Sequence, residues 1–222
     1  PEREETFELP GQPAKITKVY FSQLVGSGPL TLVLEELGRE VEVREFHLLN
    51  PAQERIRFAI CSCMDDERHT PEIWQDLVAQ DPDFIIFAGD SVYCDSGDGS
   101  DVGEARLWRR FAEARATLEI YFSKKLIPIF FTWDDHDFGS NDAGRSFPYV
   151  KESQINFLRF NAMEPSNCSM LNRGPGVSSS FVIGNQQFIL MDDRSWRWAK
   201  GAKDRYAHWG KEQEDWMWSR MA

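Results

Sequence analysis

The chain has 222 residues, of which 41% are apolar, with 16 Phe and 8 Trp; this composition excludes a disordered chain and allows a substantial core. Its net charge of -11, from 36 acidic and 25 basic residues, argues against a stable nucleic-acid partner, because phosphate backbones need clustered Lys and Arg. No apolar run approaches the roughly 20 residues of a membrane span, and no signal-peptide pattern is visible.

The first 50 residues have a different pattern from the rest of the chain. Short alternating or apolar runs at 16–21, 30–34 and 41–46 are separated by Gly-containing turns, which is typical of the hairpins of a small β-sandwich. We therefore expect a partial β-sandwich-like N-terminal domain over 1–50 and a second domain over 51–222.

From Ile56 the pattern predicts alternating strands and helices, and hence an α/β fold. The run from Phe84 to Phe87 is continuously apolar, as expected of a central parallel strand. Since parallel strands have their carboxyl ends at one edge, the polar loops that follow them should meet there. The predicted strands are 56–61, 83–89 and 126–133. One predicted helix begins at Thr70-Pro71-Glu72, and a second covers about 104–124.

The last third of the chain predicts a hairpin between two helices. Ser179–Ile183 and Gln187–Met191 flank the turn residues Gly184-Asn185, and the second strand ends in Asp192-Asp193-Arg194. The helices are expected over 151–163 and 211–221.

Acidic residues crowd the loops after the second and third strands of the sheet. Bare carboxylates a few Å apart repel each other by several kcal/mol at an intermediate dielectric, and a bound cation removes that repulsion. Asp90 is placed to bridge two cations, and Tyr93 lies three residues further on. The acidic residues are Asp90, Asp95, Asp98, Asp101, Asp134, Asp135, Asp137 and Asp142.

Four motifs from Arg55 onward resemble the PhoD-like alkaline phosphatases, which belong to the calcineurin-like metallophosphoesterase superfamily. The resemblance implies a metallophosphatase-type α/β sandwich with an N-terminal β-sandwich-like segment. The motifs are Ser62-Cys63, Gly89-Asp90-Ser91-Val92-Tyr93, Trp133-Asp134-Asp135-His136-Asp137 with Asn141-Asp142, and Met191-Asp192-Asp193-Arg194 followed by 210–216.

The resemblance implies a dinuclear or trinuclear site with iron and calcium. Cys63 is similar to the thiolate ligand of iron, Asp90 to the bridging carboxylate, Tyr93 to the phenolate on the same iron, and Asp135 to a ligand of the calcium-type site. The donor chemistry agrees, because thiolate and phenolate suit a softer or trivalent ion and carboxylates suit calcium.

Two further residues resemble contacts to the substrate rather than to the metals. His136 resembles the histidine that contacts the phosphate or the leaving group. Arg194 is a candidate phosphate contact through its guanidinium fork, with a structural ion pair to Asp192 or Asp193 as the alternative.

Each candidate also has a purely structural interpretation. Asp134, Asp135 and Asp137 can form a solvated turn, Cys63 can be an inert buried thiol, and Tyr93 can simply pack its ring. Four cysteines are too few for a disulfide framework, and we interpret Cys61, Cys94 and Cys168 as inert thiols. For His69 and His208 we expect a surface or capping role, with metal ligation as the alternative.

We therefore expect metal-dependent hydrolysis of small phosphate mono- or diesters by a metal-bound hydroxide, in a periplasmic or extracellular setting if the chain is typical of the family. The alternatives are a catalytically incomplete metal- or phosphate-binding domain and a metallonuclease. The family closes its site with an Asp-x-His motif after the last helix, and none of the four histidines lies after the helix predicted at 211–221. We thus expect the second domain to lack its C-terminal part, which leaves the activity of the chain open.

Overall fold

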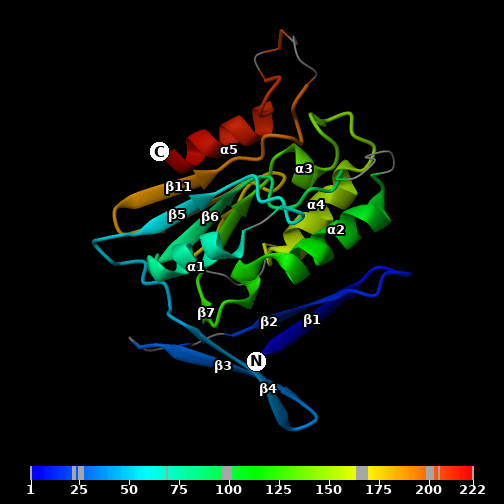
Figure 1. The fold of residues 1–222 in the computed structure, drawn as a ribbon. Helices are drawn as coiled ribbons and strands as arrows, with labels where there is room; N and C mark the ends of the chain where they lie inside the picture. The colour runs from blue at the N-terminus through cyan, green and yellow to red at the C-terminus, as the bar shows by residue number, and fades with distance from the viewer. Residues whose placement is uncertain are drawn as a thin grey trace.

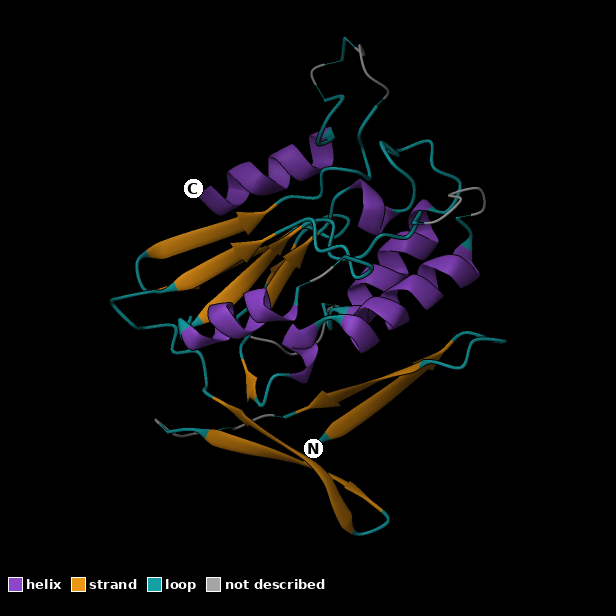
Figure 2. Cartoon of the chain, in the orientation of Figure 1, coloured by secondary structure: helices purple, strands orange, loops and turns teal. Residues whose placement is uncertain are grey.

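A computed structural model describes residues 2–21, 24, 28–68, 70–96, 102–163, 170–198, 203–204 and 206–221 (Figure 1). Four residues named above, His69, Asp98, Asp101 and Cys168, lie outside this set. The described chain forms layers of helices and sheets with two β-hairpins beneath them (Figure 2). The predicted α/β class is confirmed.

A parallel sheet of three strands is the centre of the larger part. Its order is β5 (Phe58–Cys61), β6 (Phe84–Ala88) and β8 (Ile129–Thr132). Side chains of β6 are buried on both faces, as a central parallel strand requires. Phe84 and Ile86 belong to one apolar cluster, whereas Ile85 and Phe87 belong to another, so β6 joins two cores.

Helices form the larger of these cores against one face of the sheet. Trp74, Leu107, Phe138 and Phe157 represent the four helices in this cluster. Phe87 and Phe131 belong to the same cluster, and the rings of Phe138 and Phe157 pack on Trp133, which directly follows β8. The helices are α1 (Pro71–Ala79), α2 (Glu104–Thr117), α3 (Asp135–Phe138) and α4 (Val150–Phe160), and a 3₁₀ turn, η1 (Glu119–Phe122), follows α2.

An antiparallel sheet forms the other core. It has the order β11 (Gln186–Leu190), β10 (Ser179–Ile183) and β9 (Asn172–Arg173). The rings of Phe130 and Phe181 stack with centroids 3.7 Å apart, which joins the two sheets. The last helix, α5 (Lys211–Met221), lies beside β11, where Gln187 Nε2 donates to the Arg220 carbonyl at 2.7 Å (Figure 1).

The first 50 residues form two antiparallel hairpins, as the alternating runs predicted, and add a strand that they did not, β1. The first hairpin pairs β1 (Arg3–Glu8) with β2 (Lys15–Tyr20), and the second pairs β3 (Leu30–Glu36) with β4 (Arg39–Phe46). The short β7 (Lys125–Leu126) pairs with β4 in parallel. This pairing attaches the second hairpin to the larger part of the chain.

Three predicted elements differ from the structure. The helix expected over 104–124 ends at Thr117, because Leu118 is extended (φ -70°, ψ 122°) and buries its side chain. The strand expected over 126–133 is split, because Pro128 separates β7, which pairs with β4, from β8, which pairs with β6. The loop expected after Trp133 contains one helical turn, α3, which a capping box between Asp134 and Asp137 begins.

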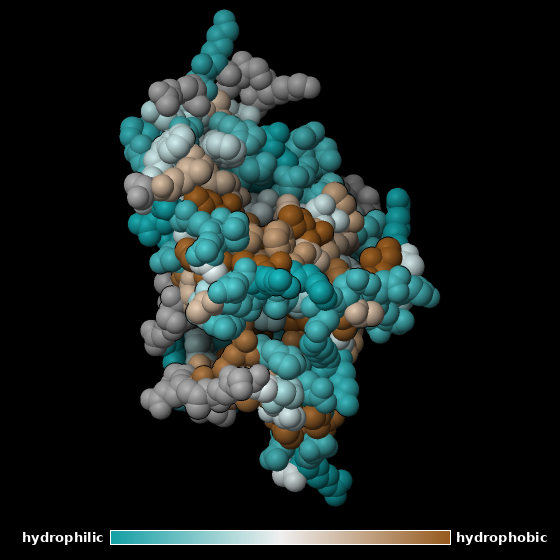
Figure 3. Space-filling view, turned by 90° about the vertical axis from the view of Figure 1, so that its left-hand side faces the viewer, coloured by the Kyte–Doolittle hydropathy of each residue, from teal (hydrophilic) through white to brown (hydrophobic). Residues whose placement is uncertain are grey.

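One edge of the parallel sheet shows apolar side chains at the surface. Among the described residues β5 pairs with β6 alone, and Ile60 is 63% exposed. Apolar patches also interrupt the polar surface on the side of the molecule that Figure 3 shows. Within the described chain, no helix has both the length and the apolar character needed to cross a bilayer.

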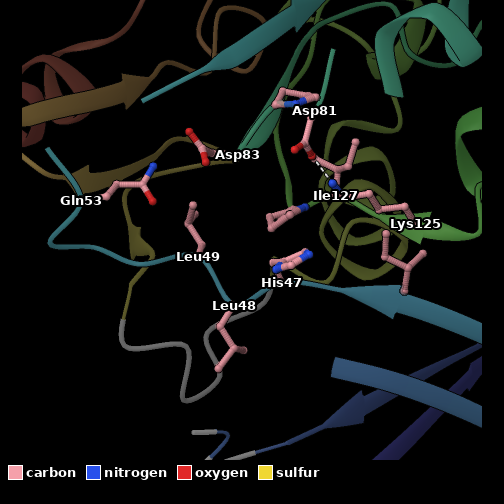
Figure 4. Close-up of a pocket in the computed structure, with 11 residues that line it drawn as sticks. His47, Leu48, Leu49, Gln53, Asp81, Asp83, Lys125 and Ile127 are labelled. Atoms are coloured by element: carbon pink, nitrogen blue, oxygen red, sulfur yellow. Dashed lines mark hydrogen bonds and ion pairs between the residues drawn. The ribbon is translucent and has the colours of Figure 1, made fainter. Parts of the chain in front are cut away.

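A small pocket of about 260 Å³ lies at the amino ends of the strands (Figure 4). His47, Asp83 and Lys125 line it, and the Lys125 ammonium pairs with Asp81. Because Asp83 precedes β6 and Asp90 follows it, this pocket and the acidic loops lie at opposite ends of the sheet. The pocket is therefore separate from the predicted site.

Candidate metal centre

The loops after β5 and β6 are joined at the carboxyl edge of the sheet. The Cys63 N–H donates to the Gly89 carbonyl at 3.2 Å, and the Met64 N–H donates to the Asp90 carbonyl at 2.7 Å. Cys63 and Asp90 both have left-handed backbone, with φ of 56° and 52°. Such conformations are uncommon and costly for non-glycine residues, and they tend to cluster at functional sites.

Gly89 allows the loop after β6 to approach the loop after β8. Its φ is +113°, and a Cβ at this position would lie 2.7 Å from the Asp134 Cβ and 2.9 Å from the Asp134 nitrogen. Only glycine fits this backbone and this separation.

We expect Gly89→Ala to lower the free energy of unfolding by about 3 kcal/mol or more, since the new methyl group meets main chain that cannot move aside. Gly38→Ala is the matched control, because Gly38 also has positive φ, +75°, but has nothing within 4 Å of the added Cβ. That variant should lose only about 1 kcal/mol in urea unfolding. Equal losses in the two variants would contradict the close approach at Gly89.

The structure brings together four predicted groups at this edge. A ring nitrogen of His136 and carboxylate oxygens of Asp90 and Asp135 all lie within 4.8 Å of one another. The Cys63 Sγ is 3.7 Å from the Asp90 Oδ2. Asp135 is only 7% exposed and Asp137 is fully buried, so these two carboxylates do not form the solvated turn of the structural alternative, whereas the Asp134 side chain is 37% exposed. Asp90 is also 7% exposed.

Tyr93 closes one side of this group. Its ring stacks on the His136 ring with centroids 4.3 Å apart, and its hydroxyl lies close enough to Cys63 for the thiol to influence its pKa. Burial, and then the negative charges of Asp90 and Cys63, raise the pKa of Tyr93. Burial also raises the pKa of Asp90, and the like charges of Asp134 and Asp135 add to this shift.

Asp95 holds the imidazole of His136, an arrangement that the motifs did not predict. The Asp95 Oδ1 is 2.6 Å from His136 Nδ1, and its Oδ2 accepts the Asn141 N–H at 2.7 Å. Burial lowers the pKa of His136, but Asp95, Asp90 and Asp135 outweigh that effect and raise it overall. The His136 Nε2 is therefore the nitrogen left for a ligand or substrate.

Asp137 is a structural residue at the base of the site. It is fully buried, and its two oxygens accept hydrogen bonds from the backbone N–H groups of Asp90, Ser91, Val92 and Asp134 and from the Ser91 hydroxyl. Burial raises the pKa of Asp137 to about 7 against the opposing effect of these donors. The three-residue spacing of Asp134 and Asp137 is the sequence signal for this capping role.

Arg194 is buried among carboxylates. Its guanidinium pairs with Asp134, its Nε lies 3.3 Å from an Asp193 oxygen, and its Nη2 lies 3.6 Å from the Asp135 Oδ1. It donates to no Asp192 oxygen through its side chain; only its backbone N–H does so, at 3.1 Å. The structure thus places this cation beside a predicted metal ligand and in ion pairs with Asp134 and Asp193.

A groove of about 700 Å³ leads away from the cluster. Cys63 and Tyr93 line the groove together with Ile60 of β5 and Ile73 of α1. The groove therefore borders two of the predicted metal ligands. Cys61, Cys63 and Cys94 are free thiols; Cys94 is buried and Cys61 is partly buried, whereas Cys63 is exposed, so it is not the inert buried thiol of its structural interpretation.

The donor set suits cations of the kind that metallophosphatases bind. Buried carboxylates that repel one another, a thiol and a phenol converge with one imidazole, and a cation would lower the raised pKa values of Asp90 and Tyr93. The set combines sulfur and phenol donors, which suit softer or trivalent ions, with carboxylates, which suit calcium. The residues therefore fit a metal site.

The fold and this donor cluster are those of a metallophosphoesterase domain, an α/β domain with metal-binding loops at one sheet edge. The chain belongs to the calcineurin-like phosphoesterase family, whose model matches residues 56–216. No curated protein matches the chain at a significant level.

One similar solved structure is that of PhoD. Its TM-score is 0.66 at 18% sequence identity, and the match covers 88% of this chain and 45% of the PhoD chain. At this identity the likeness shows the fold alone. The chain spans less than half the length of PhoD.

Proposed function

We propose that the chain carries the core of a hydrolase for phosphate mono- or diesters that uses iron and calcium. The observation that supports this most is the convergence of a thiol, a phenol, two buried carboxylates and an imidazole at the carboxyl edge of the parallel sheet. All of these residues lie within the part of the chain that the family model matches. A nuclease is less favoured, because the chain has a net charge of -11 and the site itself is lined by carboxylates.

Each ligand role follows from the position of the side chain. Cys63, Asp90 and Tyr93 would hold the iron, and Asp90 with Asp135 would hold the calcium. When bound, such ions polarise phosphoryl oxygens and lower the pKa of water. Asp90 lies between the thiol and Asp135, which makes it the residue that can serve both ions.

His136 is the candidate general acid. Asp95 holds Nδ1, so the protonated ring directs its Nε2–H away from Asp95 and can give that proton to a leaving alkoxide. Arg194 would contribute mainly by orienting Asp134 and Asp135, and its positive charge also favours a phosphate nearby.

Metal removal tests the proposal. The chain should release nitrophenol from nitrophenyl phosphate or bis-nitrophenyl phosphate with added iron and calcium, and EDTA should reduce the rate at least about 100-fold, because the ions supply several kcal/mol of charge stabilisation. Readdition of the ions should restore it. A rate that is insensitive to EDTA would contradict a metal-dependent hydrolase.

The same assay separates the enzyme from a binding domain. Elemental analysis gives the metal content of the chain used for turnover. Stoichiometric metal without release of nitrophenol from either ester would favour a domain that binds metal or phosphate only.

A further inference from the structure

Asp192 and Gln213 form a fully buried pair between the last helix and the loops of the candidate centre. The Gln213 Oε1 accepts the Asp192 N–H at 2.6 Å, and its Nε2 donates to the Asp192 carbonyl at 2.7 Å. The amide thus satisfies both main-chain groups of Asp192, as a neighbouring strand would. A side chain of α5 thereby fixes the backbone just after β11.

The Asp192 carboxylate connects this backbone to the end of β8. Its Oδ1 accepts the Trp133 Nε1–H at 2.7 Å and the backbone N–H groups of Arg194 and Ser195 at 3.1 and 2.9 Å. Its Oδ2 accepts the Val177 N–H at 3.0 Å and the Ser195 hydroxyl at 2.7 Å. One buried carboxylate therefore joins three separate chain segments.

The two strand ends that it joins carry charged groups of the centre. Trp133 directly precedes Asp134 and Asp135, and the Arg194 guanidinium pairs with Asp134 and lies 3.6 Å from an Asp135 oxygen. The separation of Arg194 from Asp135 thus depends on the hydrogen bonds by which Asp192 connects Trp133 to the backbone of Arg194. Gln213 in turn holds Asp192.

We propose that Gln213 and Asp192 are positioning residues for the metal centre. Gln213 orients Asp192, and Asp192 aligns the Trp133–Asp135 segment with Arg194. The inference rests on the proposed function for the identity of the reaction, but the alignment itself can be measured without turnover. It assigns to α5, which lies outside the metal-binding loops, a part in the geometry of the site.

Gln213→Met tests this, since methionine has a similar length and helix propensity but cannot bond to Asp192. Loss of an outer hydrogen-bond partner of a metal site typically weakens metal binding 10- to 100-fold, so we expect the Mn²⁺ dissociation constant to rise about tenfold by calorimetry. The indole N–H resonance of Trp133, assigned with Trp133→Phe, should shift in the NMR spectrum.

Trp218→Gly is the matched control. Trp218 lies on the same helix and is 61% exposed, so this variant weakens α5 through helix propensity without touching Asp192. It should lower the unfolding temperature and leave both the Mn²⁺ affinity and the Trp133 resonance unchanged. Should Gln213→Met fail to fold, Gln213→Glu is the substitute, because it keeps an acceptor for the Asp192 N–H. Its loss of Mn²⁺ affinity and its shift of the Trp133 resonance should lie between those of the wild type and those expected for Gln213→Met.

The inference is overturned if Gln213→Met loses stability like the control but keeps both the Mn²⁺ affinity and the Trp133 resonance. A shifted resonance together with weaker Mn²⁺ binding supports it. If the wild-type chain binds Mn²⁺ but hydrolyses no phosphoester, the proposed function fails, while these two readouts still decide the positioning role.

Discussion

Asp90→Asn should reduce phosphoester turnover about a thousandfold, which corresponds to about 4 kcal/mol. Asparagine keeps the volume of the side chain but removes the charge that the cations need at the centre of the cluster. The rate is measured with nitrophenyl phosphate at saturating metal. The effect is expected in the rate of the chemical step, because this carboxylate lies between Cys63 and Asp135.

The same substitution should not destabilise the metal-free fold. Asp90 is a buried carboxylate close to Asp134 and Asp135, and loss of its charge removes like-charge repulsion. We expect an unchanged or higher unfolding temperature without metal. Asp65→Asn is the control, since Asp65 lies in the Cys63 loop and lines the same groove but, among the described residues, bonds locally, to the Glu67 N–H and Arg68. Turnover above one tenth of wild type in Asp90→Asn would rule out the central role of Asp90.

Asp137→Ala should cost about 4 kcal/mol or more in free energy of unfolding. The substitution leaves several buried backbone N–H groups without an acceptor, and each such group costs about 1–3 kcal/mol. These donors belong to Asp90, Ser91, Val92 and Asp134. Urea unfolding followed by circular dichroism measures the loss.

Two variants keep this prediction testable if Asp137→Ala does not fold. Asp137→Asn retains one acceptor and should lose about 2 kcal/mol. Asp204→Ala removes an exposed carboxylate that accepts one hydrogen bond, from the Tyr206 N–H, and should lose less than about 1 kcal/mol. If Asp137→Asn loses no more than Asp204→Ala, then Asp137 does not organise the site.

The sequence predicted the class of fold and the edge of the sheet that carries the site. Continuous apolar strands such as Phe84–Phe87, each followed by Asp or Cys, indicated parallel strands with polar ends, and β5, β6 and β8 have that arrangement. Cys63, Asp90, Tyr93, Asp135 and His136 lie together as the motifs indicated. Their roles as ligands remain predictions.

Local pattern could not predict the residues that support the site. Asp95, Asp192 and Gln213 lie within stretches that the sequence singled out, but they act through hydrogen bonds to residues that are 41, 59 and 21 positions away, and local pattern does not show such partners. The ends of α2 and β8 were also missed, because burial of Leu118 and the missing N–H of Pro128 act only in the folded context. The sequence left Arg194 open between a phosphate contact and a structural ion pair. In the structure its guanidinium forms ion pairs with Asp134 and Asp193 at the edge of the site, a position that is compatible with both roles.

Anomalous diffraction from crystals of the chain grown with iron and calcium tests the metal centre most directly. We predict an iron peak bonded to the Cys63 sulfur, the Asp90 carboxylate and the Tyr93 oxygen, with a second ion on Asp90 and Asp135. An iron peak bonded to none of these side chains, in crystals whose elemental analysis shows bound iron, would contradict the account.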